Sequence, residues 1–355
     1  MNTRAATLIR PEILALSAYR VPSSAGFIKL DAMENPYAFP VELKSQLMAQ
    51  LADASINRYP DPSAIELRAA IRSAMNIPDA LDIVVGNGSD EIIQMIATAC
   101  AKPGAVLLSF EPSFVMFRMI ATFCGLHYVG VPLTKDFEID LDATLAAIKQ
   151  HQPAVMFIAY PNNPSGNLFE RDALCAIMRL CPGLVVIDEA YFAFSHSSFL
   201  EEIADFPNAV LMRTVSKLGL AGLRLGLLAG HPEWTREFDK VRLPYNINCL
   251  TQAAATFALK HYPALLAQAA TMRTERETLS ARLAGIPGVT VFPSEANFIL
   301  IRIPDSEKTF NALLSRKILV KHTSAAHPLL DNTLRLTIGT ASENTALVSA
   351  LHDTI

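Results

Sequence analysis

The chain has 355 residues, of which 51% are hydrophobic and 18% charged, and its formal net charge is −4 at pH 7. This composition excludes a disordered chain and provides enough apolar side chains for two domains. A slightly acidic chain with no basic stripe gives no reason to expect a nucleic-acid partner, whereas small anionic substrates stay possible.

The five cysteines are scattered, without a Cys-x-x-Cys pair or a histidine at metal-ligand spacing. This pattern predicts reduced thiols and no metal site. Near the N-terminus, Arg10, Pro11 and Glu12 interrupt the apolar run that a signal peptide needs. No segment approaches the roughly 20 apolar residues of a membrane helix. We therefore expect a cytoplasmic protein without a membrane segment.

Residues 1–40 lack a sustained hydrophobic period and contain four prolines, which predicts an N-terminal arm laid over another part of the molecule. A helical pattern follows over residues 41–52. From about residue 80 to 230, short β-rich runs alternate with helical patterns, as in α/β domains, and we expect this large domain to span 41–250. Its candidate strands cover residues 82–85, 105–110, 128–131, 154–159, 184–187, 209–212 and 224–229. Further candidate helices lie near 89–101, 113–123, 140–150 and 170–180.

Continuous apolar strands such as 155–159 indicate burial on both faces, which predicts a mostly parallel seven-stranded sheet between helices. The rest of the chain has fewer and shorter elements, which favours a smaller α+β domain over residues 251–355. Its candidate elements are a helical stretch at 250–284, strands at 297–303, 318–321 and 334–338, and helices at 306–316 and from 342.

Polar motifs follow several of the predicted strands, where open α/β sheets bind ligands. Segment 86–91 (Gly-Asn-Gly-Ser-Asp-Glu) combines a glycine turn with a helix start, whose free N–H groups favour a phosphate. Segment 160–166 (Tyr-Pro-Asn-Asn-Pro-Ser-Gly) holds two amides in a rigid turn. Taken alone, each segment is more often an ordinary turn or helix cap.

Two charged residues stand at the ends of apolar strands. A carboxylate at Asp188 costs desolvation unless it is paired, and a pyridinium N–H is a suitable partner. Lys217 follows Thr214 and Ser216, and burial beside other cations would lower the pKa of its amine and expose a nucleophile. The two hydroxyls and Arg224 could together bind a phosphate. The alternatives are an ordinary turn acid and a solvated surface lysine, which are the commoner cases.

The order Asn-Pro-Ser-Gly, Asp-x-x-Tyr, Ser-Lys and then Arg resembles the fold-type I pyridoxal-phosphate aminotransferases over nearly the whole chain. Segments 58–62, 86–91 and 334–340 are similar to the histidinol-phosphate aminotransferase family. This resemblance implies the PLP-dependent transferase fold type I and transamination of L-histidinol phosphate with 2-oxoglutarate, which gives imidazole-acetol phosphate and L-glutamate in histidine biosynthesis. An aromatic amino-acid aminotransferase and a phosphothreonine decarboxylase are the alternatives on the same scaffold.

The resemblance also implies roles for single residues. Lys217 would hold pyridoxal phosphate as a Schiff base and shuttle a proton, while Asp188 would pair with the ring nitrogen. Asn163 and Tyr191 would bind the ring oxygen, and Phe114 would stack on the ring. The residues implied for the phosphate are Ser89, Asp90, Thr214, Ser216 and Arg224.

Further residues are implied for the substrate. Arg335 would bind the carboxylate of glutamate and the phosphate of the other substrate, since a guanidinium fork suits both anions. Lys321 and Tyr19 are further candidates for the substrate phosphate. Tyr59 would reach into the site of a second copy, which implies a homodimer with shared active sites.

Three positions depart from the family pattern. Arg224 follows Lys217 by seven residues, one fewer than the usual spacing, so its phosphate contact depends on a shortened loop. Phe114 stands where tyrosine is more familiar and lacks its hydroxyl. Lys321 stands where arginine is expected, and it keeps the charge without the bidentate fork.

Overall fold

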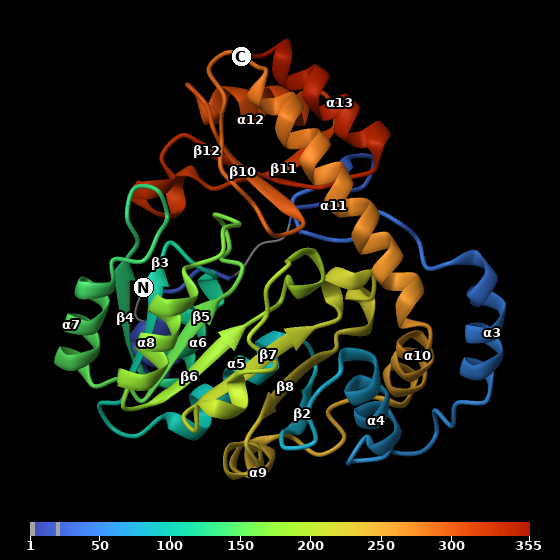
Figure 1. The fold of residues 1–355 in the computed structure, drawn as a ribbon, viewed down its shortest axis with the longest axis vertical. Coiled ribbons are helices and arrows are strands. Elements are labelled where there is room, and N and C mark those ends of the chain that lie inside the picture. Colours follow the sequence, from blue (N-terminus) through green and yellow to red (C-terminus); the bar gives the residue numbers. More distant parts are fainter. Residues whose placement is uncertain (1–3, 19–21) are drawn as a thin grey trace.

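The computed structural model describes residues 4–18 and 22–355, which form two β-sheets with helices around them (Figure 1). The larger sheet has seven strands in the order β2-β8-β7-β6-β5-β3-β4. All of its neighbouring strands are parallel except where β8 pairs with β2 and β7. Its strands are β2 (Asp82–Gly86), β3 (Val106–Glu111), β4 (His127–Pro132), β5 (Val155–Ala159), β6 (Leu184–Asp188), β7 (Ala209–Thr214) and β8 (Gly226–Gly230). The predicted fold class, with its mostly parallel seven-stranded sheet, is confirmed.

Helices cover both faces of this sheet, and successive strand residues alternate between two hydrophobic clusters. In β5, Val155 and Phe157 belong to one cluster, whereas Met156 and Ile158 belong to the other. This two-sided burial explains the continuous apolar run of that strand. The first face is covered by α5 (Ser89–Cys100), α6 (Val115–Cys124) and α9 (Pro232–Val241). The second is covered by α4 (Ile65–Met75), α7 (Leu141–His151), α8 (Arg171–Leu180) and α10 (Cys249–Lys260).

The smaller sheet has five strands in the order β1-β11-β12-β10-β9 and lies at the top of Figure 1. It is antiparallel except where β1 runs parallel to β11. Its strands are β1 (Ile28–Leu30), β9 (Thr290–Val291), β10 (Phe298–Arg302), β11 (Ile318–His322) and β12 (Thr333–Thr337). Its helices are α11 (Tyr262–Ala284), α12 (Ser306–Ser315) and α13 (Ala341–His352).

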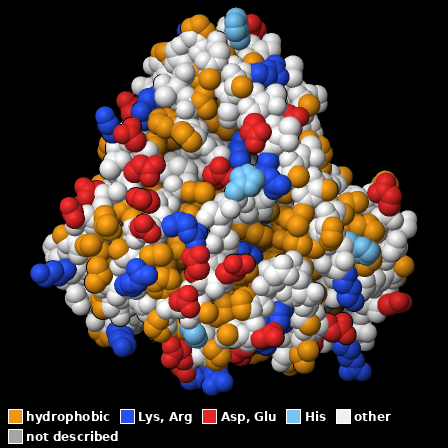
Figure 2. All heavy atoms as spheres, viewed as in Figure 1, with side chains coloured by type: hydrophobic (Ala, Val, Ile, Leu, Met, Phe, Trp, Pro, Cys, Tyr) orange, Lys and Arg blue, Asp and Glu red, His pale blue; other side chains and the backbone are white. Residues whose placement is uncertain are grey.

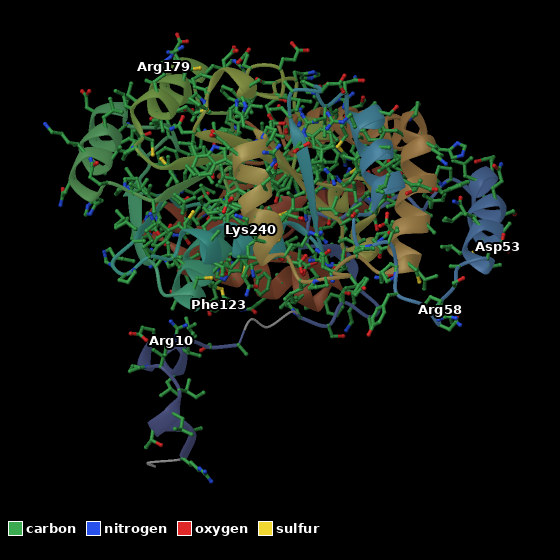
Figure 3. The ribbon with its side chains drawn as sticks, turned by 90° about the horizontal axis from the view of Figure 1, so that it is seen from below. Arg10, Asp53, Arg58, Phe123, Arg179 and Lys240 are labelled. Carbon is green, nitrogen blue, oxygen red and sulfur yellow. The ribbon has the colours of Figure 1, made fainter. Side chains whose placement is uncertain are left out.

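The N-terminal segment, which was predicted to be an arm over residues 1–40, contains two short exposed helices and one strand of the smaller sheet. The short helices α1 (Arg4–Leu8) and α2 (Pro11–Leu14) contain no buried residue and hang away from the body (Figure 3). Arg10 ties them to the body, because its Nη2 donates to the carbonyl of Phe123 at 2.5 Å. Strand β1, in contrast, is part of the smaller sheet.

The division of the chain at residue 250 stays a prediction. The helix that crosses this position, α10, packs against α4, which contacts β2 of the larger sheet, and against α3 (Val41–Ala52) on the outside. Pro263 stands at the start of α11 and separates it from α10, so the helical stretch predicted over 250–284 is two helices. Within the described ranges, no helix is long and apolar enough to cross a membrane, and no group of three or more potential ligands could hold a metal ion.

A buried ion pair joins the ends of β6 and β7 beside the site described below. The carboxylate of Glu189 accepts hydrogen bonds from Arg213 Nη2 at 2.8 Å and from the backbone N–H of Phe199 at 2.6 Å. Both charged side chains are at most 5% exposed. Replacing Glu189 by glutamine leaves the guanidinium without its counter-charge, so we expect a loss of about 3–5 kcal/mol in the free energy of unfolding.

Urea denaturation measures this loss. The matched control is Glu202→Gln, because Glu202 pairs with Arg171 on the surface, with side chains 49% and 36% exposed. An exposed pair contributes at most about 1 kcal/mol, so the control should stay close to the parent protein. An equal loss of unfolding free energy in the two variants would contradict the larger contribution expected from the buried pair.

Candidate active site

A cavity of about 190 Å³ lies at the carboxyl ends of β5, β6 and β7, beside the start of α5. This is the edge where an open α/β sheet binds its ligand. Ten of the predicted site residues line it: Ser89, Asp90, Phe114, Asn163, Asp188, Tyr191, Thr214, Ser216, Lys217 and Arg224. The chain thus brings together residues that lie more than a hundred positions apart in the sequence.

One end of the cavity is built for an anion. It combines the N-terminus of α5, at Ser89, with the hydroxyls of Thr214 and Ser216, which lie 2.9 Å from each other. Helix N-termini present free N–H groups and a positive dipole end, and neighbouring hydroxyls add further donors. We therefore identify this end as the candidate phosphate site.

Arg224 reaches this end despite its short spacing from Lys217. Its backbone adopts φ +49°, so β8 begins two residues later than the predicted start at 224, and its guanidinium Nη2 lies 3.6 Å from the Asp90 carboxylate. Gly88 is required for this approach, because a Cβ there would lie 2.6 Å from Arg224 Nη2. Gly226 similarly allows β8 to pass close to the backbone N–H of Ser89. The shortened loop therefore keeps the arginine at the candidate phosphate site.

The centre of the cavity holds a lysine and a carboxylate whose pKa values are both displaced. Burial, reinforced by the charge of Arg335, lowers the pKa of Lys217 to about 8. Burial raises the pKa of Asp188 to about 7, although its carboxylate accepts a hydrogen bond from the Ala190 N–H at 3.0 Å. A neutral amine is a nucleophile, and a buried carboxylate favours a cationic partner.

A third group of side chains connects the cavity to the smaller sheet. Asn163 Nδ2 donates to the hydroxyl of Tyr191 at 3.1 Å. The same amide accepts a hydrogen bond from Arg335 Nη1 at 2.6 Å through its oxygen. Burial also raises the pKa of the Tyr191 phenol, which therefore stays a hydrogen-bond donor at neutral pH. Arg335, on β12, thus contacts the lining residue Asn163 but is not itself part of the cavity lining.

The other predicted substrate residues lie outside the cavity lining. Lys321 stands opposite Arg335 in the β11–β12 pair, and burial together with that charge lowers the pKa of its amine. Tyr59 is 80% exposed, and its ring stacks on Tyr245 at 4.4 Å. Tyr19 lies outside the described residues.

Sequence reasoning missed the segment 31–34, which we call the wall segment. Ala32, Met33 and Glu34 line the cavity. The carbonyl of Ala32 accepts from Lys217 Nζ at 3.5 Å, and the Sδ of Met33 accepts from the Tyr191 hydroxyl at 3.4 Å. No motif marks this segment, because its place is set by β1 and not by a local turn.

The low pKa of Lys217 has a direct kinetic consequence. Only the neutral amine attacks a carbonyl, so its rate of reaction with an added aldehyde such as pyridoxal phosphate should rise with pH and level off above about 8. An ordinary lysine would level off only above about 10.4. Stopped-flow absorbance on protein freed of cofactor measures this rate. A plateau above pH 10 would contradict the buried setting of the amine.

The sequence profile of the family "Aminotransferase class I and II" matches residues 25–351. The chain belongs to this family. A histidinol-phosphate aminotransferase of Chromobacterium violaceum is 55% identical over 344 residues, which is 97% of each chain. Histidinol-phosphate aminotransferase 2 of Cupriavidus pinatubonensis is 51% identical and covers 97% of this chain and 95% of its own. Within its class, this aminotransferase therefore belongs with the histidinol-phosphate aminotransferases.

The crystal structure of histidinol-phosphate aminotransferase from Sinorhizobium meliloti, in complex with pyridoxal-5'-phosphate, has the same fold. It superposes on this aminotransferase with a TM-score of 0.86 at 24% identity, and the match covers 98% of this chain and 97% of the other.

The cavity of this aminotransferase fits pyridoxal phosphate on its own chemistry. The candidate phosphate site suits the phosphate ester of the cofactor, and the buried Lys217 amine can react with its aldehyde. Burial alone pushes the Asp188 carboxyl toward its neutral form, and a protonated ring nitrogen would restore the ionised form. Phe114 provides an aromatic face in the lining.

Proposed function

We propose that this protein uses pyridoxal phosphate to transfer the amino group of L-histidinol phosphate to 2-oxoglutarate, yielding imidazole-acetol phosphate and L-glutamate in histidine biosynthesis. The observation that carries the proposal is the 55% identity to a histidinol-phosphate aminotransferase over 97% of both chains. The cavity supports it, because ten residues of the expected constellation surround one space.

Bound pyridoxal phosphate supplies an aldehyde and a ring that accepts electrons. The chain's own groups position it. Ser89, Thr214 and Ser216, together with Arg224, would hold the phosphate, and Asp90 holds Arg224 in place.

The remaining cavity residues would control protons and charge. Lys217 provides the nucleophilic amine and, as a base at Nζ, would take a proton from the amine-bearing carbon of the substrate. Asp188 would keep the ring nitrogen protonated, and Asn163 and Tyr191 would bind the ring oxygen. Phe114 would stack on the ring and exclude water from one side.

Arg335 would bind two anions in turn, the carboxylate of glutamate and the phosphate of histidinol phosphate, with Lys321 as the neighbouring cation. Replacing Arg335 by lysine keeps the charge but loses the two-pronged hydrogen bond. We expect the KM for glutamate to rise about 10-fold, with a smaller change in kcat, because one charge-assisted hydrogen bond is lost. An unchanged KM would contradict this role.

Separate half-reactions test the function. Glutamate should convert the bound aldehyde cofactor to its amine form, and imidazole-acetol phosphate should convert it back, both followed by absorbance. If only aromatic 2-oxo acids restored the aldehyde form, the protein would be an aromatic amino-acid aminotransferase. Release of carbon dioxide from phosphothreonine would instead identify a decarboxylase.

We also propose that the protein acts as a homodimer with shared active sites. Exposed hydrophobic side chains gather on and beside the helices α3, α4 and α10, and Figure 2 shows hydrophobic atoms across the middle of the viewed face, toward α10. Tyr59 lies among them and does not line the cavity of its own chain. The residues concerned are Val41, Met48, Ile56, Tyr59, Ile65, Leu243, Tyr245 and Leu250.

Subunit mixing tests this arrangement. In a hybrid of a Lys217→Ala chain and a Tyr59→Ala chain, one of the two sites receives both native residues. Random mixing of two nearly inactive variants should therefore restore about a quarter of the parental activity. No recovery, or a monomer by light scattering, would overturn the shared site. We place the enzyme in the cytoplasm, which the five free cysteines support and cell fractionation tests.

A further inference from the structure

The wall segment is held rigidly against the cavity. The N–H of Met33 donates to Thr337 Oγ1 at 2.9 Å, and its carbonyl accepts from Asn297 Nδ2 at 2.9 Å. Met33 itself adopts φ +54°, a conformation that a non-glycine residue keeps only where its surroundings impose it. These contacts fix the position from which the next side chain, Glu34, reaches into the cavity lining.

Three acidic side chains line the cavity, and two of them belong to the cofactor. Asp90 pairs with Arg224 at the candidate phosphate site, and the buried Asp188 is the proposed partner of the ring nitrogen. Glu34 has no role in holding the cofactor. It is the carboxylate of the lining that is left for a substrate.

The Glu34 carboxylate is oriented by a lysine. Its Oε2 accepts from Lys29 Nζ at 2.7 Å, and the same Nζ lies 3.3 Å from Asp31 Oδ1. The Glu34 side chain is 48% exposed, so a ligand in the cavity can reach it. Its charge also acts on the reaction centre, since it works against the lowering of the Lys217 pKa. A carboxylate accepts several hydrogen bonds, so the lysine leaves room for a further donor.

We propose that Glu34 is a specificity-determining residue, which accepts a hydrogen bond from the imidazole N–H of the substrate. This inference rests on the proposed function. The imidazole ring carries an N–H donor, whereas the phenyl ring of phenylalanine carries none. A carboxylate facing a phenyl ring loses its solvent without gaining a partner, and a site built around a hydrogen bond rejects the analogue that lacks the donor.

Paired substrates test the inference. Glu34→Gln keeps the size of the side chain and an amide oxygen, and we expect kcat/KM for histidinol phosphate to fall about 10-fold. Glu34→Leu removes the acceptor, and the fall should reach about 100-fold. For phenylalanine, kcat/KM in both variants should equal or exceed that of the parent enzyme. Glu201→Gln, which removes an exposed charge outside the cavity lining, is the matched control and should change neither value.

A binding measurement separates recognition from chemistry. Histidinol phosphate forms a dead-end complex with the pyridoxamine-phosphate form, and its calorimetric Kd should rise by the same factors as kcat/KM falls. Equal losses for both amines, or an unchanged ratio between them, would overturn the role of Glu34. If the parent enzyme itself preferred phenylalanine, the proposed function would fail instead, so the two failures are distinguishable.

Discussion

Replacing Lys217 by alanine should abolish the visible absorbance of the purified protein and lower kcat by at least about 10⁴-fold. In the proposed mechanism the Lys217 amine is both the nucleophile for the cofactor and the base for the substrate, so one substitution removes both activities. The lowered pKa of about 8 shows that the Lys217 amine is buried, and an alanine places no charge in that buried position. Absorbance spectra and single-turnover kinetics measure the two effects.

Lys240→Ala is the control for this substitution. Lys240 lies on α9 (Figure 3), where its side chain is 66% exposed and pairs with Glu237, and it does not line the cavity. This variant should keep both the absorbance and kcat. A Lys217→Ala protein that kept the yellow cofactor band after dialysis would show that another amine holds pyridoxal phosphate.

Replacing Asp188 by asparagine should lower kcat by about 10²–10³-fold, the usual effect of removing one preorganised electrostatic contact from a buried site. A neutral amide cannot keep the ring nitrogen protonated, so the ring accepts electrons less well. The binding of glutamate should change little, because its carboxylate is proposed to bind Arg335 and not Asp188. Single-turnover rates and KM values together distinguish these effects.

An exposed aspartate provides the comparison. Asp205→Asn, at the surface near the end of a short turn, removes the same charge without touching the cavity and should leave kcat unchanged. A parental kcat in Asp188→Asn would mean that the ring nitrogen does not depend on this carboxylate.

The larger sheet was predictable because its central strands β5, β6 and β7, and β8 beside them, are continuous buried runs. The helices α4 and α9 were missed, although both cover the sheet. In α9, Trp234, Phe238 and Val241 recur at helical spacing and pack against the cluster on the first face, so the apolar stripe was present in the sequence and was overlooked. Strand β1 was also missed, because three residues form it and its partner β11 is distant in sequence. Such elements depend on tertiary contacts that local pattern does not encode.

The candidate site, too, contains residues that were predictable from the sequence and others that were not. Asp188 ends β6, Lys217 stands three residues after β7, and the segment before α5 follows β2, so reasoning from strand ends brings them together. The sequence could not show whether Arg224 still reaches the candidate phosphate site despite its short spacing from Lys217. The answer depends on the left-handed backbone conformation of Arg224. Glu34 lay outside every motif, because its place depends on β1 before it and on the hydrogen bonds that hold its neighbour Met33. These bonds join Met33 to Thr337 in β12 and to Asn297, one residue before β10.

The wall segment also dictates when the site can form during synthesis. The hydrogen bonds from Arg335 to Asp31 and from Met33 to Thr337 each span 304 positions of the chain. The wall segment leaves the ribosome early, but its contacts with β12 can form only after nearly the whole chain has been synthesised. A nascent chain halted before β11 would carry every residue from Ser89 to Arg224 and still lack a finished pocket. Cofactor capture is thus expected to follow release of the completed polypeptide.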